Sequence, residues 1–131
     1  MRLRPYLQVD DTPFTATADA IRGQRGSPLR AQRNLVALNE LDYGDVIYRF
    51  QGCGRLEEVT QRTPVLYLLE DSAVIDVPLA GLAKFVRARD AQCFERAGFL
   101  VSPRHGLAFV PHEPGWLTAL AAHCIDTWRA L

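Results

Sequence analysis

The amino-acid sequence predicts an α+β fold, in which a single antiparallel sheet, arranged as a meander, carries helices packed on it. Three observations lead to this class. Apolar and polar residues alternate through the middle of the chain, short turns separate these segments, and helical spacing dominates only the last third. The chain has 131 residues, 48% of them hydrophobic and 23% charged, which is typical of a globular domain. We therefore expect residues 1–131 to form one domain.

The N-terminal third contains short elements. Residues 3–9 are expected as a strand that ends in the turn-forming residues 10–13. Residues 15–22 are expected as a helix, with Thr15 or Thr17 as its N-cap and Gly23 or Gly26 at its end. Four arginines and no acid occur between positions 22 and 33, around a Gly-Ser-Pro turn, so this segment predicts a basic loop.

The central third predicts the meander. Every second side chain of residues 46–50 is apolar, and residues 52–54 supply a hairpin turn to a second strand over residues 55–61. Leu56 and Val59 have opposite parity, which favours a β-bulge or an irregular strand there. Residues 65–69 and 73–77 add two further strands. The expected core contacts of the sheet are Val46, Tyr48, Phe50, Leu66 and Leu68.

The last third predicts helices around one hairpin. A helix is expected to begin near Pro78, and Asp90 is expected to cap a second, short helix through residue 97. Residues 99–101 and 107–110 are typical of a hairpin. Pro114 is expected to open a closing helix, whose apolar stripe is Leu117, Leu120, Ala121, Cys124 and Trp128.

The charge balance restricts the class of partner. Fifteen basic residues match fifteen acidic ones, so the net charge is zero and a general binder of nucleic acid or of membrane surfaces is disfavoured. No apolar run approaches the ~20 residues of a membrane span, and the first residues lack the pattern of a signal peptide. We expect a cytoplasmic protein that binds neither nucleic acid nor a membrane.

Cys53 is the candidate nucleophile, because it lies between two glycines in an exposed turn, where His105 or His112 would have to act as its base. Neither a Gly-x-Ser-x-Gly motif nor a Gln-Ala-Cys-type motif accompanies it. Cys93 and Cys124 fall on apolar stripes and are expected in the core. No catalytic residue is assigned, although a small enzyme or ligand-binding protein that uses Cys53 or the loop histidines remains the alternative.

Metal and cofactor sites are not expected. A metal would have to draw on His105, His112, Glu113, His123 and Cys124, but these show neither paired-ligand spacing nor a His-Glu-x-x-His motif. The glycines and arginines of residues 23–28 follow a helix instead of opening one, which disfavours a phosphate-binding loop.

A protein-binding surface is the function that remains. Acidic residues before the first central strand, together with Glu57 and Glu58 across the hairpin, would form an anionic edge on the sheet. Tyr43 and Arg49 are suitable anchors beside it, because tyrosine and arginine are enriched at binding hot spots. The predicted protein-binding residues are Asp42, Tyr43, Asp45, Arg49, Glu57 and Glu58.

A series of short motifs supports this function by resemblance. In order, they are Phe14-Thr15-Ala16-Thr17, Ile21, Gly26-Ser27-Pro28, Asn34, Tyr43-Gly44-Asp45-Val46 and Leu56-Glu57-Glu58-Val59. The series resembles a Phe-Gly-x-Thr and Gly-x-Pro pattern of small bacterial proteins that are similar to immunity proteins, with Thr15 where the pattern has glycine. The resemblance implies a non-enzymatic protein whose partner is a bacterial toxin domain.

Overall fold

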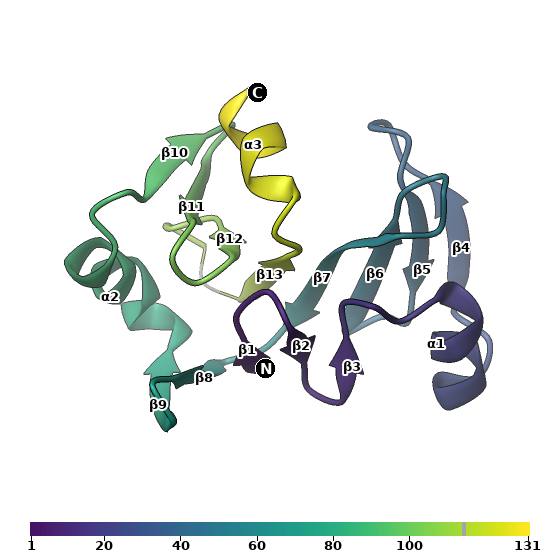
Figure 1. The fold of residues 1–131 in the computed structure, drawn as a ribbon, viewed down its shortest axis with the longest axis horizontal. Coiled ribbons are helices and arrows are strands. Elements are labelled where there is room, and N and C mark those ends of the chain that lie inside the picture. The colour runs from purple at the N-terminus through teal and green to yellow at the C-terminus, as the bar shows by residue number, and fades with distance from the viewer. Residues whose placement is uncertain (114) are drawn as a thin grey trace.

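The computed structural model describes residues 1–113 and 115–131. Strands hold 42% of the residues and helices only 19%, so the fold is mostly β. It contains two sheets, one of eight strands and one of five (Figure 1). The prediction of a single antiparallel sheet with helices packed on it is therefore wrong.

The eight-stranded sheet is antiparallel throughout, in the order β10-β11-β12-β13-β7-β6-β5-β4. Its strands are β4 (Arg30–Arg33), β5 (Asn39–Asp42), β6 (Val46–Phe50), β7 (Leu56–Arg62), β10 (Phe94–Arg96), β11 (Phe99–Ser102), β12 (Leu107–Phe109) and β13 (Trp116–Leu120). The last four residues of the expected basic loop form β4, which pairs with β5. The pairing of β7 with β13 joins two segments that lie far apart in the sequence.

The five-stranded sheet has the order β3-β2-β1-β8-β9. Its strands are β1 (Arg2–Arg4), β2 (Gln8–Val9), β3 (Thr12–Pro13), β8 (Val65–Glu70) and β9 (Ala73–Pro78). The expected N-terminal strand is a hairpin of β1 and β2, whose turn holds Tyr6 at a φ of 66°. β1 and β8 are parallel, and the Tyr67 N–H donates to the Met1 carbonyl (2.8 Å). Pro64 separates β7 from β8, and its missing N–H favours the end of the β7 ladder there.

The β6–β7 hairpin and its bulge confirm two predictions. Arg49 lies opposite Glu58 and Phe50 lies opposite Leu56, so Glu57 is the extra residue of a β-bulge. The bulge changes the parity of β7, which allows Leu56 and Val59 to be buried in one core. The β8–β9 and β11–β12 hairpins also form where they were expected.

Three α-helices complete the fold. α1 (Ala18–Arg25) begins at Thr17, whose Oγ1 accepts from the Ala20 N–H (3.1 Å), and ends at Gly26, whose φ is 83°. A 3-10 turn, η1 (Leu79–Gly81), follows Pro78 and leads into α2 (Leu82–Arg89). α3 (Cys124–Arg129) is short. None of the helices within residues 1–113 and 115–131 has the length and apolar character needed to cross a membrane.

Two predicted helices are replaced by strands. The stripe of the closing helix begins in β13, where Leu117 and Leu120 are both fully buried because the strand lies inside the sheet. A strand buried on both faces is apolar throughout, so periodicity does not distinguish it from a helix. Pro114 lies outside the described residues. After α2, Asp90 Oδ1 accepts from the Gln92 N–H (2.9 Å), and this turn leads to β10 instead of a helix.

One apolar core joins both sheets. It includes residues of the five-stranded sheet such as Leu3 and residues of the eight-stranded sheet such as Leu117. The five side chains predicted as core contacts of the sheet are all buried. A second cluster packs α3 against β11, β12 and β13 through Val101, Ala108, Leu120, Ala121, Cys124 and Ile125. This packing positions α3 beside the bulge of β7.

Candidate functional site

A groove with a volume of about 400 Å³ lies between α3 and the strands β6 and β7. Residues 34–38, which connect β4 to β5, form one wall, and α3 forms the other. Arg49, Glu57 and Glu58 are the charged groups that line it, together with Cys124 and Trp128 of α3. We call this the bulge groove, because the bulge of β7 shapes its floor.

The bulge explains why two neighbouring glutamates line the same groove. Successive side chains of a regular strand point to opposite faces of the sheet. At Glu57 the extra residue interrupts this alternation, so Glu57 and Glu58 both line the groove while Leu56 and Val59 reach the core. The side chain of Glu57 is only 8% exposed and lies against the start of α3.

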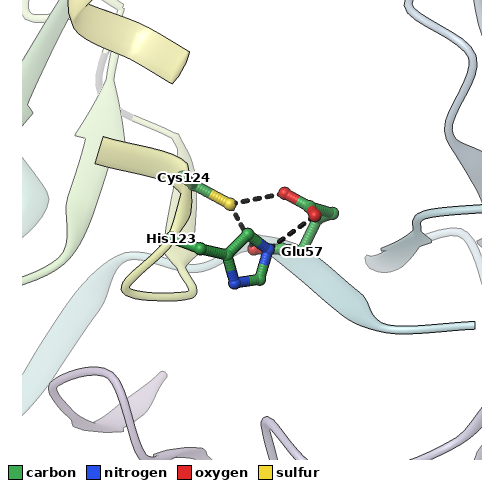
Figure 2. Close-up of side chains that lie close together, drawn as sticks. All are labelled: Glu57, His123 and Cys124. Carbon is green, nitrogen blue, oxygen red and sulfur yellow. Dashed lines mark hydrogen bonds and ion pairs between the residues drawn. The ribbon is translucent and has the colours of Figure 1, made fainter. Parts of the chain in front are cut away.

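Glu57, His123 and Cys124 form a compact cluster at the groove, which Glu57 and Cys124 line (Figure 2). The Cys124 thiol donates to Glu57 Oε2 (2.7 Å), and the imidazole Nε2 of His123 lies 2.5 Å from Glu57 Oε1. The Ala121 N–H donates to the Glu57 carbonyl (2.9 Å), which fixes the chain just before α3 to β7. The cluster is therefore held by the backbone as well as by its side chains.

The Cys124 side chain is a thiol, not an activated nucleophile. Burial raises its pKa far above the ordinary value, and the hydrogen bond to Glu57 and the charge of that carboxylate raise the pKa further. Because the thiolate is the nucleophilic form of cysteine, this environment opposes covalent catalysis.

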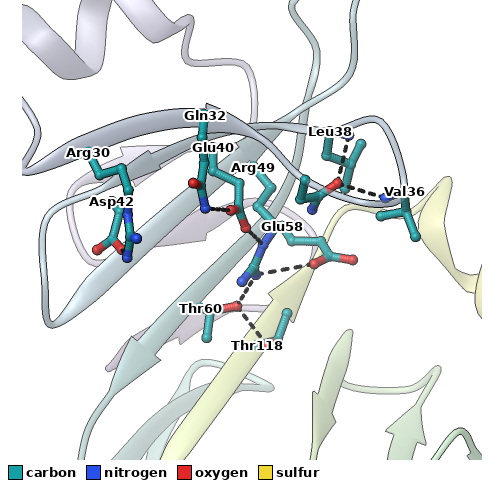
Figure 3. A network of polar contacts seen from close by, with 11 residues as sticks. Arg30, Gln32, Val36, Leu38, Glu40, Asp42, Arg49, Glu58, Thr60 and Thr118 are labelled. Atoms are coloured by element: carbon teal, nitrogen blue, oxygen red, sulfur yellow. Dashed lines mark hydrogen bonds and ion pairs between the residues drawn. The ribbon is translucent and has the colours of Figure 1, made fainter.

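Arg49 is the centre of a second polar network on the same face of the sheet (Figure 3). Its Nε donates to Glu40 Oε2 (2.6 Å), and its Nη1 donates to Thr60 Oγ1 (2.6 Å) and lies 3.5 Å from Glu58 Oε2. The arrangement follows from the pairing of the strands, which places Arg49 directly between Glu40 and Glu58. Thr60 continues the network to Thr118 of β13 (2.8 Å).

The two glutamates beside Arg49 have different environments. Burial raises the pKa of Glu58 above its ordinary value, and the charge of Arg49 only partly opposes this effect. Burial also acts to raise the pKa of Glu40, but hydrogen bonds from Arg49 and Gln32 outweigh it and lower the pKa. Arg55 is the second arginine of the site, 3.9 Å from Glu57. Glu40, Glu57 and Glu58 therefore share two arginines, so carboxylates outnumber guanidinium groups at this site.

A second pocket, of about 300 Å³, adjoins the bulge groove. Arg49, Glu58 and Trp128 line both, and the second pocket continues to aromatic residues of β11, β12 and β13. Large apolar side chains lie exposed beside the bulge groove at Leu35, Val36 and Leu131, and Leu35 is fully exposed. The polar face of the sheet thus offers an extended groove with a charged centre and an apolar rim.

The structure brings together three of the six residues predicted to bind a protein. Arg49, Glu57 and Glu58 line the bulge groove. Asp42 lies at the opposite end of these strands, where its Oδ1 accepts from the Gly44 N–H (2.8 Å) and its Oδ2 pairs with Arg30 (3.5 Å).

Tyr43 and Asp45 lie in the same turn as Asp42, away from the groove. The Tyr43 hydroxyl donates to the Gly26 carbonyl (2.9 Å), and the Asp45 carbonyl accepts from the Arg62 N–H (2.8 Å). The expected acidic edge is therefore divided between the two ends of β6: Asp42 and Asp45 lie near the β5–β6 turn, and Glu57 and Glu58 lie near the β6–β7 turn.

The candidate nucleophile and its candidate bases lie in separate turns. Cys53 is exposed in the β6–β7 turn, where its thiol contacts Gln51 (3.5 Å). His105 is buried between Ser102 (3.0 Å) and Glu70 (3.3 Å). His112 is exposed in the segment after β12. The described contacts of Cys53 and His105 therefore do not support the catalytic pair that the enzyme alternative requires.

Sequence reasoning missed the grouping of Glu57, His123 and Cys124. Glu57 and His123 are 66 positions apart, and no local motif connects them. The opposite parity of Leu56 and Val59 was the available signal, because bulges often change the direction of a functional side chain. No family model, curated protein or solved structure matches this chain, so the geometry of the site is the basis for its interpretation.

Proposed function

We propose that this protein is a non-enzymatic protein-binding module that holds an extended segment of a partner protein in the bulge groove. The observation that carries the proposal is the continuity of two pockets across one sheet face, with Arg49, Glu58 and Trp128 common to both. Tryptophan and arginine in a partly desolvated groove are the side chains that most often dominate binding energy.

The groove selects for a segment that carries both apolar and basic side chains. The exposed apolar residues Leu35, Val36 and Leu131 would be covered by apolar groups of the partner. The excess of carboxylates over arginines around Glu57 and Glu58 favours lysine or arginine and opposes phosphate groups. This chemistry supports a protein partner over nucleic acid.

A bacterial toxin domain is the partner that the resemblance to immunity proteins suggests. Toxin domains that act on nucleic acid present basic clefts, which an acidic groove would attract and occupy. Under this proposal, a gene for a large secreted toxin is expected next to the gene for this chain.

A displayed library of random peptides tests the proposal, because it selects ligands by their chemistry alone. Peptides selected on the protein in the presence of a chelator are expected to share apolar and basic positions. Val36→Arg places a like charge on the rim of the groove, and we expect it to weaken the selected peptides by at least about tenfold, or about 1.4 kcal/mol. Val74→Arg is the matched control, since Val74 is an exposed valine of β9 in the other sheet.

Selection of peptides without basic residues would contradict the proposed partner chemistry. Equal binding of the selected peptides to the Val36→Arg and wild-type proteins would remove the bulge groove as the binding surface. Loss of binding in the Val74→Arg control would place the surface on the five-stranded sheet instead.

A further inference from the structure

We propose that Glu57, His123 and Cys124 bind a zinc ion at the bulge groove. This site goes beyond the proposed partner binding and does not depend on it. The three side chains offer one carboxylate oxygen, one imidazole nitrogen and one sulfur, and these ligand atoms all lie within 4.8 Å of one another (Figure 2).

The donor set selects the metal. Zinc is a borderline-soft cation that binds thiolate, imidazole and carboxylate together, whereas calcium and magnesium take oxygen ligands almost exclusively. A single buried sulfur with one imidazole and one carboxylate therefore favours zinc over the hard cations. Cobalt(II) is a suitable spectroscopic substitute, because it accepts the same ligands.

The distances require a rearrangement of the ligand atoms. Tetrahedral zinc with a Zn–S bond of about 2.3 Å and Zn–O and Zn–N bonds of about 2.0 Å has edges of roughly 3.3–3.5 Å between ligand atoms. The present S···O and N···O distances are 2.7 and 2.5 Å. These two contacts go to different oxygens of Glu57, Oε2 and Oε1, so the carboxylate must turn to coordinate through one oxygen while the three ligand atoms, now within 4.8 Å of one another, move to the tetrahedral edges.

Zinc binding leaves the charges of the cluster balanced. When zinc binds, Cys124 releases its proton to solvent, and one carboxylate and one thiolate then neutralise the dication. His123 coordinates as the neutral imidazole.

The position of the cluster and its number of ligands also suit a zinc ion. Glu57 and Cys124 line the bulge groove and the His123 side chain is 27% exposed, so the cluster borders the solvent side of the core. With three protein ligands, a tetrahedral zinc ion keeps a fourth position for a water molecule.

Titration of the chelator-treated full-length protein with zinc, in competition with a chromophoric chelator, tests the proposal. We expect one equivalent of zinc per chain. Cobalt(II) should give the d–d absorption of a tetrahedral site together with a thiolate-to-cobalt charge-transfer band. Cys124→Ser is expected to remove that band and to weaken zinc binding by at least about tenfold, whereas Cys53→Ser, which changes the exposed turn thiol, should leave both unchanged.

His123→Gln keeps the test decisive if Cys124→Ser does not fold, because His123 is partly exposed and lies outside the buried core. It should weaken zinc binding by at least about tenfold, while His112→Gln, which changes an exposed histidine elsewhere, should not. Less than one equivalent of zinc on the wild type, or equal affinity in His123→Gln and His112→Gln, would overturn the zinc site. Neither result would affect the peptide experiment, which is done in the presence of a chelator.

Discussion

Arg49 is the residue on which the polar face of the eight-stranded sheet depends. It contacts Glu40, Glu58 and Thr60 at once, and its side chain is only 20% exposed. Removal of one partner from a partly buried charge network leaves the remaining charges without compensation. The neighbouring carboxylates would then repel each other across the sheet.

We expect Arg49→Met to lower the free energy of unfolding by about 2–3 kcal/mol, which is below the full value for a buried pair because water still reaches the network. Arg30→Met is the control, since Arg30 also pairs with a carboxylate but is 64% exposed, and its loss should cost less than about 1 kcal/mol. Chemical denaturation measures both variants. Equal costs for the two would show that Arg49 is no more important than a surface ion pair.

The N-cap of α1 is a prediction at the scale of the element. Sequence reasoning allowed either Thr15 or Thr17, and only Thr17 accepts a hydrogen bond from the first turn of the helix. We expect Thr17→Ala to lower the free energy of unfolding by about 1 kcal/mol, because one N–H of the first turn loses its partner. Thr15→Ala should change the free energy of unfolding little. A larger effect of Thr15→Ala than of Thr17→Ala would mean that the helix begins earlier.

β13 is the element that joins the two halves of the large sheet, since it pairs with β12 on one side and β7 on the other. Leu120 lies in this strand with 0% exposure. We expect Leu120→Ala to lower the free energy of unfolding by about 2–4 kcal/mol, through lost burial and the cavity that remains. The cost comes from the burial of Leu120 inside the sheet.

The exposed Leu35 provides a matched control for the Leu120→Ala substitution in β13. Leu35→Ala removes the same atoms from a side chain that is open to solvent, so its effect should be within about 0.5 kcal/mol. An unchanged denaturation midpoint for Leu120→Ala would show that β13 is not docked between its two neighbours.

At the scale of the whole molecule, a polar network around the buried Asp90 connects the two sheets. Asp90 follows α2 and accepts from the Ser102 hydroxyl of β11 (2.7 Å) and from the Arg104 N–H (3.0 Å). The Arg104 side chain in turn pairs with Glu70 at the end of β8. This network links the β11–β12 turn of the large sheet to β8 of the small one.

The pKa of Asp90 predicts how stability depends on pH. Burial acts to raise this pKa, but the hydrogen bonds from Ser102, Arg104 and Gln92 outweigh burial and hold it below the ordinary value of 3.8. The folded state therefore releases the proton more readily than the unfolded state. Its contribution to stability is complete above pH 3.8 and is lost as the pH falls through the lowered pKa.

We expect Asp90→Asn to lower the free energy of unfolding at neutral pH by about 2 kcal/mol, the scale of hydrogen bonds to a charged group. The difference in the free energy of unfolding between this variant and the wild type should shrink as the pH falls below 3.8. Asp126→Asn, at a side chain that is 96% exposed, is the control and should change the free energy of unfolding by less than about 0.5 kcal/mol. If the difference in the free energy of unfolding between Asp90→Asn and the wild type stayed constant through acid pH, it would contradict the lowered pKa of Asp90.

The sequence by itself determined the local features of this fold. The β6–β7, β8–β9 and β11–β12 hairpins, the bulge signalled by Leu56 and Val59, and the helix after Pro78 all form where they were expected. Each depends on turn chemistry or on side-chain alternation between near neighbours, and these act within a few residues. The burial of Tyr48 and Phe50 follows from the same alternation.

Only the tertiary structure decided how these pieces are paired. The separation into two sheets, the parallel pairing of β1 with β8 and the strand character of β13 all depend on which distant edges meet. The candidate site has the same origin, since the pairing of β7 with β13 brings Glu57 to His123 and Cys124. Strand pairing uses backbone groups that nearly every residue carries, so the side-chain pattern specifies that a segment pairs but not its distant partner.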